Sequence, residues 1–223
     1  MWIFWVLFFI AAILLVFWML RIERVRSATH VKECRAVAAK MGVSYEYDAP
    51  DALVAKIKGF DLTYSDGDTI RKGIRDIFAQ RSSTEDLYLF LHEHRGSMPG
   101  GVGGTGHRET VGCLVSKRLR LPRFRLSPER PIEKIASIFG AQDVDFDSHP
   151  AFSRSYFLNT NDEATVRSLF DSTVLDFFDR HTGFNVEGNA DTLVIYQFNK
   201  SMSVNELPAF HETVKQIADL FKI

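Results

Sequence analysis

The pattern of apolar and polar positions divides the chain into one unbroken apolar run and a long mixed remainder. Residues 1–20 carry no charged or polar side chain. As a helix, a run of this length spans roughly 30 Å, the thickness of the hydrocarbon core of a bilayer. Trp2 and Trp5 stand at one end and Trp18 at the other, as in the aromatic belts at the two membrane interfaces. The run therefore predicts a transmembrane helix rather than a buried helix of a globular core.

A cleaved signal peptide is the main alternative for this segment. Such peptides carry basic residues before a shorter apolar core and small residues at the cleavage site. Here no basic side chain precedes the run, and the bulky residues 18–20 stand where small ones would be needed. An uncleaved anchor is favoured.

The segment 21–41 is predicted to be a basic juxtamembrane helix that ends at Gly42. Residues 21–40 hold six basic and two acidic side chains, a net charge of +4. Positive flanks stay on the cytoplasmic side of a membrane. We expect a single-pass protein of a bacterial inner membrane, with the N-terminus outside and the C-terminal domain cytoplasmic. Alternatively, Arg21, Arg24 and Arg26 bind anionic lipid headgroups.

Beyond Gly42, short strand and helix patterns alternate irregularly, and no βαβ repeat appears. The predicted strands are residues 43–47, 74–81, 87–94, 109–119, 152–158, 184–187 and 192–198, and the predicted helices are residues 51–58, 131–139, 160–183 with a break near Asp171, and a terminal amphipathic helix. This pattern indicates an α+β domain over residues 42–223 with an antiparallel sheet and a C-terminal amphipathic helix. Its two halves, 43–126 and 127–223, could form separate sub-layers.

The last two helices carry their own start signals. Thr160 to Glu163 and Ser203 to Glu206 both match the capping box, in which the first and fourth residues satisfy each other's backbone amides. The terminal helix then places Phe210, Val214, Ile217 and Phe221 on one face, which we expect to be buried (a stripe of apolar positions at helical spacing).

Composition agrees with one anchor and one ordinary domain. The hydrophobic fraction falls from 46% for the whole chain to about 41% without residues 1–20, which still supports a packed core. Residues 41–223 have a net charge of −5, so a nucleic-acid partner is not expected. Two cysteines, Cys34 and Cys113, exclude a disulfide scaffold and are consistent with a reducing compartment.

The strongest candidate for chemistry is a group of histidines. His92 and His94 share one face of a predicted strand because side chains alternate along it. If the strand beginning near His107 pairs with it, His107 and Glu109 approach, and the set could hold zinc, iron or manganese. The simpler interpretation is a solvated strand end.

The other motifs give weaker evidence for a functional site. Residues 101–106 match G-x-G-x-x-G, but a strand pattern follows where a phosphate-binding loop needs a helix, so a glycine-rich hairpin loop is favoured. The aspartates at 143, 145 and 147 lack the glycine and glutamate of a calcium loop. Five basic side chains within 117–125 are typical of a charged edge strand. The chain contains no nucleophile or H-E-x-x-H motif.

Two stretches of the second half resemble a known group of proteins. Residues 121–129 read LPRFRLSPE, and residues 142–156 read QDVDFDSHPAFSRSY. They are similar to a family of uncharacterised bacterial single-pass membrane proteins with the pattern LPxFxLxPE…DxDFxxHPxFSxxY. The resemblance implies a membrane location and no particular activity. Relatives have an aromatic-rich strand where this chain has His92 to His94, which argues against a family-wide metal site.

Taken together, these features predict a membrane-anchored cytoplasmic binding or assembly module, without a cofactor, that contacts the bilayer through residues 1–20 and binds an unidentified protein partner. Two alternatives stay open. One is a membrane-anchored metalloenzyme using His92, His94, His107 and Glu109. The other is an anionic-lipid-binding module.

Overall fold

The computed structural model describes residues 28–60, 62, 67–94, 107–129 and 143–222. The predicted transmembrane helix 1–20, the headgroup candidates Arg21, Arg24 and Arg26, the glycine-rich stretch 96–106 and the predicted helix 131–139 lie outside these residues. Within the described ranges, no helix has the length and apolarity needed to cross a bilayer.

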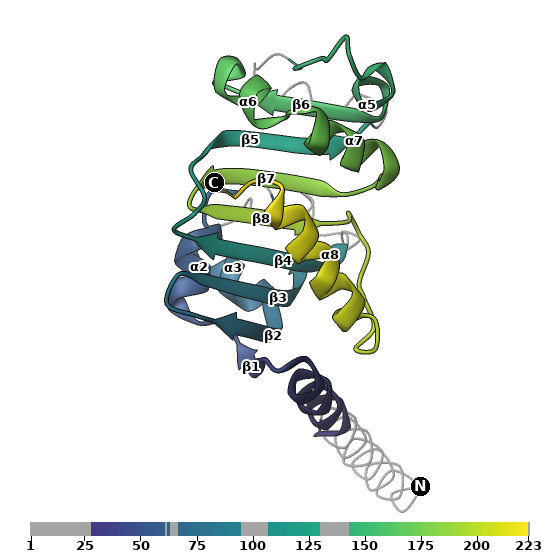
Figure 1. Cartoon of the computed structure of the whole chain (residues 1–223). Helices are drawn as coiled ribbons and strands as arrows, with labels where there is room; N and C mark the ends of the chain where they lie inside the picture. The colour runs from purple at the N-terminus through teal and green to yellow at the C-terminus, as the bar shows by residue number, and fades with distance from the viewer. Residues whose placement is uncertain (1–27, 61, 63–66, 95–106, 130–142, 223) are drawn as a thin grey trace, which may run out of the picture.

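The centre of the fold is one sheet of eight strands, all paired antiparallel (Figure 1). Its spatial order is β1-β2-β3-β4-β8-β7-β5-β6. The strands are β1 (Ser44–Asp48), β2 (Ile74–Arg81), β3 (Glu85–His94), β4 (His107–Ser116), β5 (Leu121–Pro128), β6 (Tyr156–Thr160), β7 (Asn185–Ala190) and β8 (Thr192–Tyr196). The predicted α+β class with an antiparallel sheet is confirmed.

Helices cover both faces of this sheet. In Figure 1 the helices α2 and α3 lie behind it, while the remaining labelled helices lie in front. The N-terminal helix, described over 28–41, lies below β1 in this view, and its residues Cys34 and Ala38 belong to the same core as α8. The helices are α2 (Asp51–Ile57), α3 (Gly67–Gly73), α5 (Pro150–Ser155), α6 (Glu163–Leu169), α7 (Ser172–Arg180) and α8 (Leu207–Asp219). The predicted C-terminal helix is confirmed as α8.

Alternation along the strands produces two hydrophobic cores. In β3, Leu87 and Leu89 belong to the core under α8, whereas Tyr88 and Phe90 belong to the core under α2 and α3. The front core is the larger one, because it also contains aromatic side chains of helices α5, α7 and α8. All four residues of the predicted apolar face of α8 are buried there (Phe210, Val214, Ile217 and Phe221).

Two predictions in the second half are wrong. Residues 152–158 were expected to form one strand, but α5 occupies Pro150–Ser155 and only the last part enters β6. Proline fits the first turn of a helix, where its missing N–H is not needed. The capping residue of α6 is Asp162, whose Oδ1 accepts a hydrogen bond from the Thr165 amide at 3.1 Å. Thr160 instead closes the end of β6 by donating to the carbonyl of Arg123.

The basic stretch 117–125 is not an edge strand, which corrects a third prediction. Its second part lies in β5, which pairs with β7 on one side and β6 on the other. The pairing of β5 with β7 shifts register between Leu121 and Phe124, and Pro122, which has no amide hydrogen, falls inside this irregularity. The strand β5 also spans position 126, the proposed boundary between the two sub-layers.

The predicted break near Asp171 is confirmed, and it defines a test of helix capping. Asp171 Oδ1 accepts from the Val174 amide at 3.0 Å at the start of α7. We expect Asp171→Ala to lower the free energy of unfolding by about 1 kcal/mol, because the amide loses its acceptor. Urea unfolding followed by circular dichroism measures this. The exposed Asp147→Ala should change it by less than about 0.5 kcal/mol, and equal losses in the two variants would contradict the assignment.

Candidate functional site

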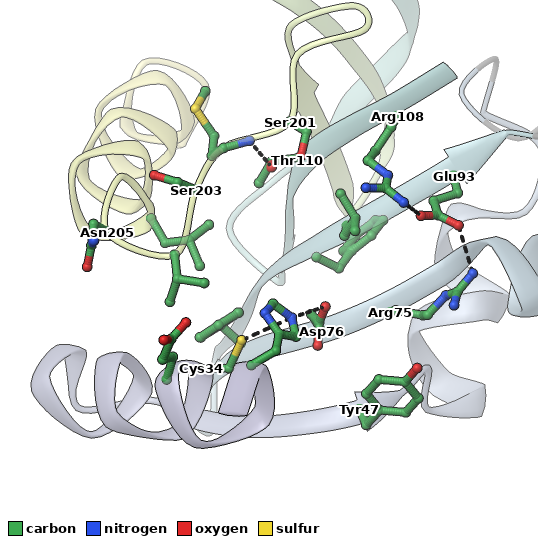
Figure 2. Close-up of a pocket in the computed structure, with 18 residues that line it drawn as sticks. Cys34, Tyr47, Arg75, Asp76, Glu93, Arg108, Thr110, Ser201, Ser203 and Asn205 are labelled. Atoms are coloured by element: carbon green, nitrogen blue, oxygen red, sulfur yellow. Dashed lines mark hydrogen bonds and ion pairs between the residues drawn. The ribbon is translucent and has the colours of Figure 1, made fainter. Parts of the chain in front are cut away.

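A cavity of about 580 Å³ opens on the front face of the sheet, between the N-terminal helix and the segment that leads into α8. Strands β2, β3 and β4 form its floor (Figure 2). Its apolar lining includes Phe78, Leu91, Met202, Val204 and Leu207. Its volume lies within the range of small-molecule sites, roughly 300–1,000 Å³.

A charged triad stands at one end of the cavity. Arg75 on β2 donates from Nη2 to Glu93 Oε2 at 2.7 Å, and Arg108 on β4 donates to the other oxygen of the same carboxylate. Hydrogen bonding to Tyr47 and the charge of Glu93 raise the pKa of Arg75 against the opposing effect of burial. Figure 2 shows these side chains on the side of the cavity opposite Ser203 and Asn205. The cavity therefore has a charged end and an apolar wall.

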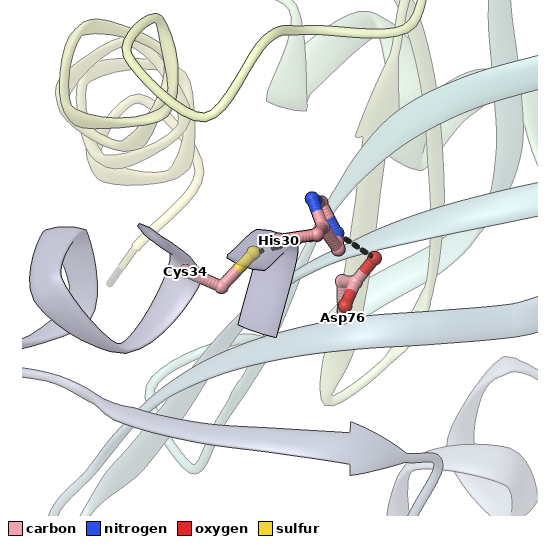
Figure 3. A group of neighbouring side chains, drawn as sticks. All are labelled: His30, Cys34 and Asp76. Atoms are coloured by element: carbon pink, nitrogen blue, oxygen red, sulfur yellow. Dashed lines mark hydrogen bonds and ion pairs between the residues drawn. The ribbon is translucent and has the colours of Figure 1, made fainter. Parts of the chain in front are cut away.

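A second polar group lines the cavity beside the N-terminal helix. His30 Nε2 lies 2.9 Å from Asp76 Oδ2 and 3.5 Å from Cys34 Sγ. Asp76 Oδ1 accepts a hydrogen bond from Tyr45 Oη at 2.6 Å. Figure 3 shows His30 between the sulfur of Cys34 and the carboxylate of Asp76. Burial, followed by the charge of Asp76, raises the pKa of Cys34 to about 11, and burial also raises that of Tyr45.

Local structure explains how these three side chains meet. His30 and Cys34 are four residues apart in one helix, so they lie on the same face. Asp76 has φ 54° and lies where the pairing of β2 with β3 shifts register between Arg75 and Phe78. Such a bulge redirects a side chain out of the regular alternation. A non-glycine residue in the left-handed region is strained, and strain of this kind gathers at functional sites.

The predicted histidine group lies on the other face of the same strands. The pairing of β3 with β4 places His92 opposite Glu109 and His94 opposite His107, a register that the sequence did not determine. His92 and Glu109 are buried, with Nδ1 and Oε1 3.5 Å apart, and Glu109 Oε2 also accepts from the Asn199 amide at 3.0 Å.

His107 packs its ring against Phe198 at a centroid separation of 4.8 Å. The side chain of His94 lies outside the described part of the structure, so metal binding by this set stays a prediction. Glu109 has a clear structural role, because its bond to Asn199 ties the end of β4 to the turn after β8.

Sequence reasoning missed the group of His30, Cys34 and Asp76. The spacing of His30 and Cys34 on a predicted helix was a usable signal for two ligands on one face. No sequence pattern placed Asp76 beside them, because that contact depends on the bulge in β2 and on the position of the N-terminal helix against the sheet.

No protein-family model matches the chain, and no curated protein matches its sequence. The resemblance to uncharacterised single-pass membrane proteins therefore stays a prediction. The fold is similar to a solved structure, that of the mycobacterial trehalose monomycolate transport factor A, TtfA, with a TM-score of 0.55 and 15% sequence identity. The similarity covers 85% of this chain and 92% of that chain. At this identity it shows that the two proteins share a fold.

Proposed function

We propose that the protein is a membrane-tethered binding module rather than an enzyme, and that its cavity holds an amphiphile with a hydrogen-bond-accepting head. One observation carries this proposal: the cavity of about 580 Å³ combines apolar lining with a cluster of two arginines and a glutamate at one end. Sites for small ligands combine an apolar lining with a few polar groups that fix orientation.

The charged end suits an acceptor head. Each guanidinium has several N–H donors, and the bonds to Glu93 occupy only part of those on Arg75 and Arg108. Because Glu93 binds both arginines, the N–H groups that do not bond to Glu93 lie close together at this end of the cavity. A hydroxyl, ester carbonyl or phosphate oxygen can accept from them.

The apolar part of the lining suits a hydrocarbon chain. Phe78 and Leu91 rise from the sheet, and Met202 and Val204 face them from the segment before α8. Methionine is flexible and fills irregular space, so it adapts to chains of varying shape. Covering such a wall with a bound chain removes apolar surface from water, at about 25 cal/mol per Å².

The position of the cavity supports tethering. The helix that lines it continues the chain from the predicted anchor, residues 1–20, so the cavity is expected to lie near the membrane surface. A protein named as a trehalose monomycolate transport factor has the same fold, which supports a role in moving or presenting a membrane amphiphile. We propose that a protein partner receives or delivers this ligand, which is the assembly role expected from the sequence.

Photolabelling tests this function directly. The full chain in phosphatidylcholine nanodiscs is exposed to a long-chain fatty acid that carries a diazirine, and labelled peptides are mapped by mass spectrometry. We expect label on the segment 201–207. Val204→Trp should reduce it about tenfold by filling the cavity, equivalent to about 1.4 kcal/mol of binding free energy. Arg108→Gln should also reduce it, because it removes donors for the head.

Val115→Trp is the matched control, since Val115 is also partly buried but packs against the core on the other face of the sheet. It should label like the wild type. Equal labelling of Val204→Trp and Val115→Trp, or label confined to residues 1–27, would overturn the proposed function. Recovery of a protein crosslinked at 201–207 in place of lipid would identify the cavity as a protein-docking site instead.

A further inference from the structure

We propose that His30, Cys34 and Asp76 form a zinc site with three protein ligands. Imidazole nitrogen, thiolate sulfur and carboxylate oxygen are the donors that zinc takes in proteins. One ligand atom from each of these residues lies within 4.8 Å of the other two. The proposal is independent of the amphiphile described above, because it needs no ligand in the cavity.

Two of the ligand separations are close to those around a tetrahedral ion. With ordinary zinc bond lengths, sulfur and nitrogen ligands of one ion lie about 3.6 Å apart, and nitrogen and oxygen ligands about 3.4 Å apart. Here Cys34 Sγ and His30 Nε2 are 3.5 Å apart, and His30 Nε2 and Asp76 Oδ2 are 2.9 Å apart. Small side-chain rotations open the second distance to accommodate an ion. The same imidazole nitrogen faces both other ligands, so an ion can replace the proton that it shares with them.

The charges of the three ligands and the hydrogen bond from Tyr45 also favour a zinc site. A thiolate and a carboxylate neutralise a divalent cation, which removes the cost of isolated charges in a partly buried position. Tyr45 Oη donates to Asp76 Oδ1 and thereby leaves Oδ2 directed at His30. Outer hydrogen bonds of this kind orient metal ligands and tune affinity. All three proposed ligands line the cavity, so a fourth position can be taken by water.

The site would join two parts of the fold. Two ligands come from the N-terminal helix, and the third comes from the bulge of β2. The helix is otherwise held to the front core by a short apolar face that includes Cys34 and Ala38. An ion bridging His30, Cys34 and Asp76 would fix the position of this helix against the sheet and thereby the shape of the cavity wall.

Binding has a defined proton balance. The Cys34 thiol loses its proton to solvent as the sulfur–zinc bond forms. The proton on His30 Nε2 leaves to solvent while Nδ1 takes one up, so that Nε2 and Asp76 Oδ2 supply lone pairs and the net release is the one thiol proton. Affinity should therefore increase with pH through release of this proton. No redox change accompanies the step.

The experiment uses the purified full chain in detergent without a histidine tag, titrated with Zn²⁺ alone and, in parallel, with Co²⁺. We expect one ion per chain and a sulfur-to-cobalt charge-transfer band. Cys34→Ser should remove the band, and His30→Gln should reduce zinc affinity by at least tenfold. Tyr45→Phe should reduce affinity by about 10–100-fold.

Cys113→Ala is the matched control, because Cys113 is the other buried cysteine and lies in the core on the opposite face. It should keep both the stoichiometry and the charge-transfer band. His30 is half-exposed, with 46% of its side chain accessible, so His30→Gln tests the site with little effect on folding. Absence of zinc binding by the wild type, or an unchanged cobalt band in Cys34→Ser, would overturn the proposal.

Discussion

Gly112→Ala is expected to lower the free energy of unfolding by about 3 kcal/mol, the upper part of the range for overpacking a core. Gly112 lies in β4 directly beneath α8. A Cβ atom there would lie 2.8 Å from Val214 Cγ1 and closer still to Val214 Cγ2. The Val214 side chain cannot easily move away from this Cβ, because Val214 is fully buried and β-branched. The helix must shift away from the sheet. Urea unfolding of the full chain in detergent, followed by far-UV circular dichroism, measures the loss.

A double-mutant cycle distinguishes the clash with Val214 from any loss of stability that replacing a glycine in a strand would cause elsewhere. Val214→Ala removes the two methyl groups that the new Cβ would meet most closely, so the double variant Gly112→Ala/Val214→Ala should be more stable than the sum of the single losses predicts. Coupling of at least about 1 kcal/mol is expected for side chains in direct contact. Additive losses would show that α8 does not rest on Gly112 as the structure indicates.

The sheet was largely predictable because its strands alternate cleanly. The bounds of β2 were predicted to the residue, and strands were expected on both sides of the glycine-rich loop, although the sequence did not determine the register in which β3 and β4 pair. In these strands one face meets α8 and the other meets α2 and α3, so side-chain period and burial agree. The terminal helix was predictable for the same reason, because one continuous stripe of it is buried.

The errors fall where local signals conflict. Phe152 and Tyr156 are spaced as on one face of a strand, yet Pro150 starts a helical turn that buries Phe152 before β6 begins. The basic residues near β5 suggested an edge, but the sheet continues beyond them through β6. The first case turned on a local helix start at Pro150, and the second on the pairing of β5 with β6, which a single sequence does not contain.

The candidate site was the least predictable part. The helix spacing of His30 and Cys34 was visible, but Asp76 joins them only through the bulge in β2, where its φ of 54° departs from regular strand geometry. The cavity wall around Met202 depends equally on tertiary structure, because its amide is held by Thr110 Oγ1 on β4 at 2.8 Å. Functional surfaces of this kind are assembled from segments distant in sequence. A residue pattern can therefore indicate single candidate residues, but it does not show which of them lie together.

Phe170→Ala is expected to lower the free energy of unfolding by about 4 kcal/mol, because truncating a buried aromatic residue leaves a cavity in addition to losing its transfer free energy. Phe170 lies between α6 and α7 and is 1% exposed. Its ring centroid lies 5.3 Å from that of Phe124 on β5 and 5.6 Å from that of Phe221 at the end of the chain. It also contacts Phe146 and Phe152 at 6.5 and 6.2 Å. One ring thus joins the sheet to three separate segments of the front layer.

Two comparisons make this result specific to the packing of Phe170. Phe170→Leu keeps most of the volume and should recover more than half of the loss, since the cost depends on the space left unfilled. Phe198→Ala removes a ring that is 41% exposed and should cost less than about 1 kcal/mol. Because Phe124, Phe146, Phe152 and Phe221 all pack on Phe170, its loss should also expose the ends of α5 and α8 to protease before global unfolding. Equal urea midpoints for Phe170→Ala and Phe198→Ala would mean that the front layer is not organised around this residue.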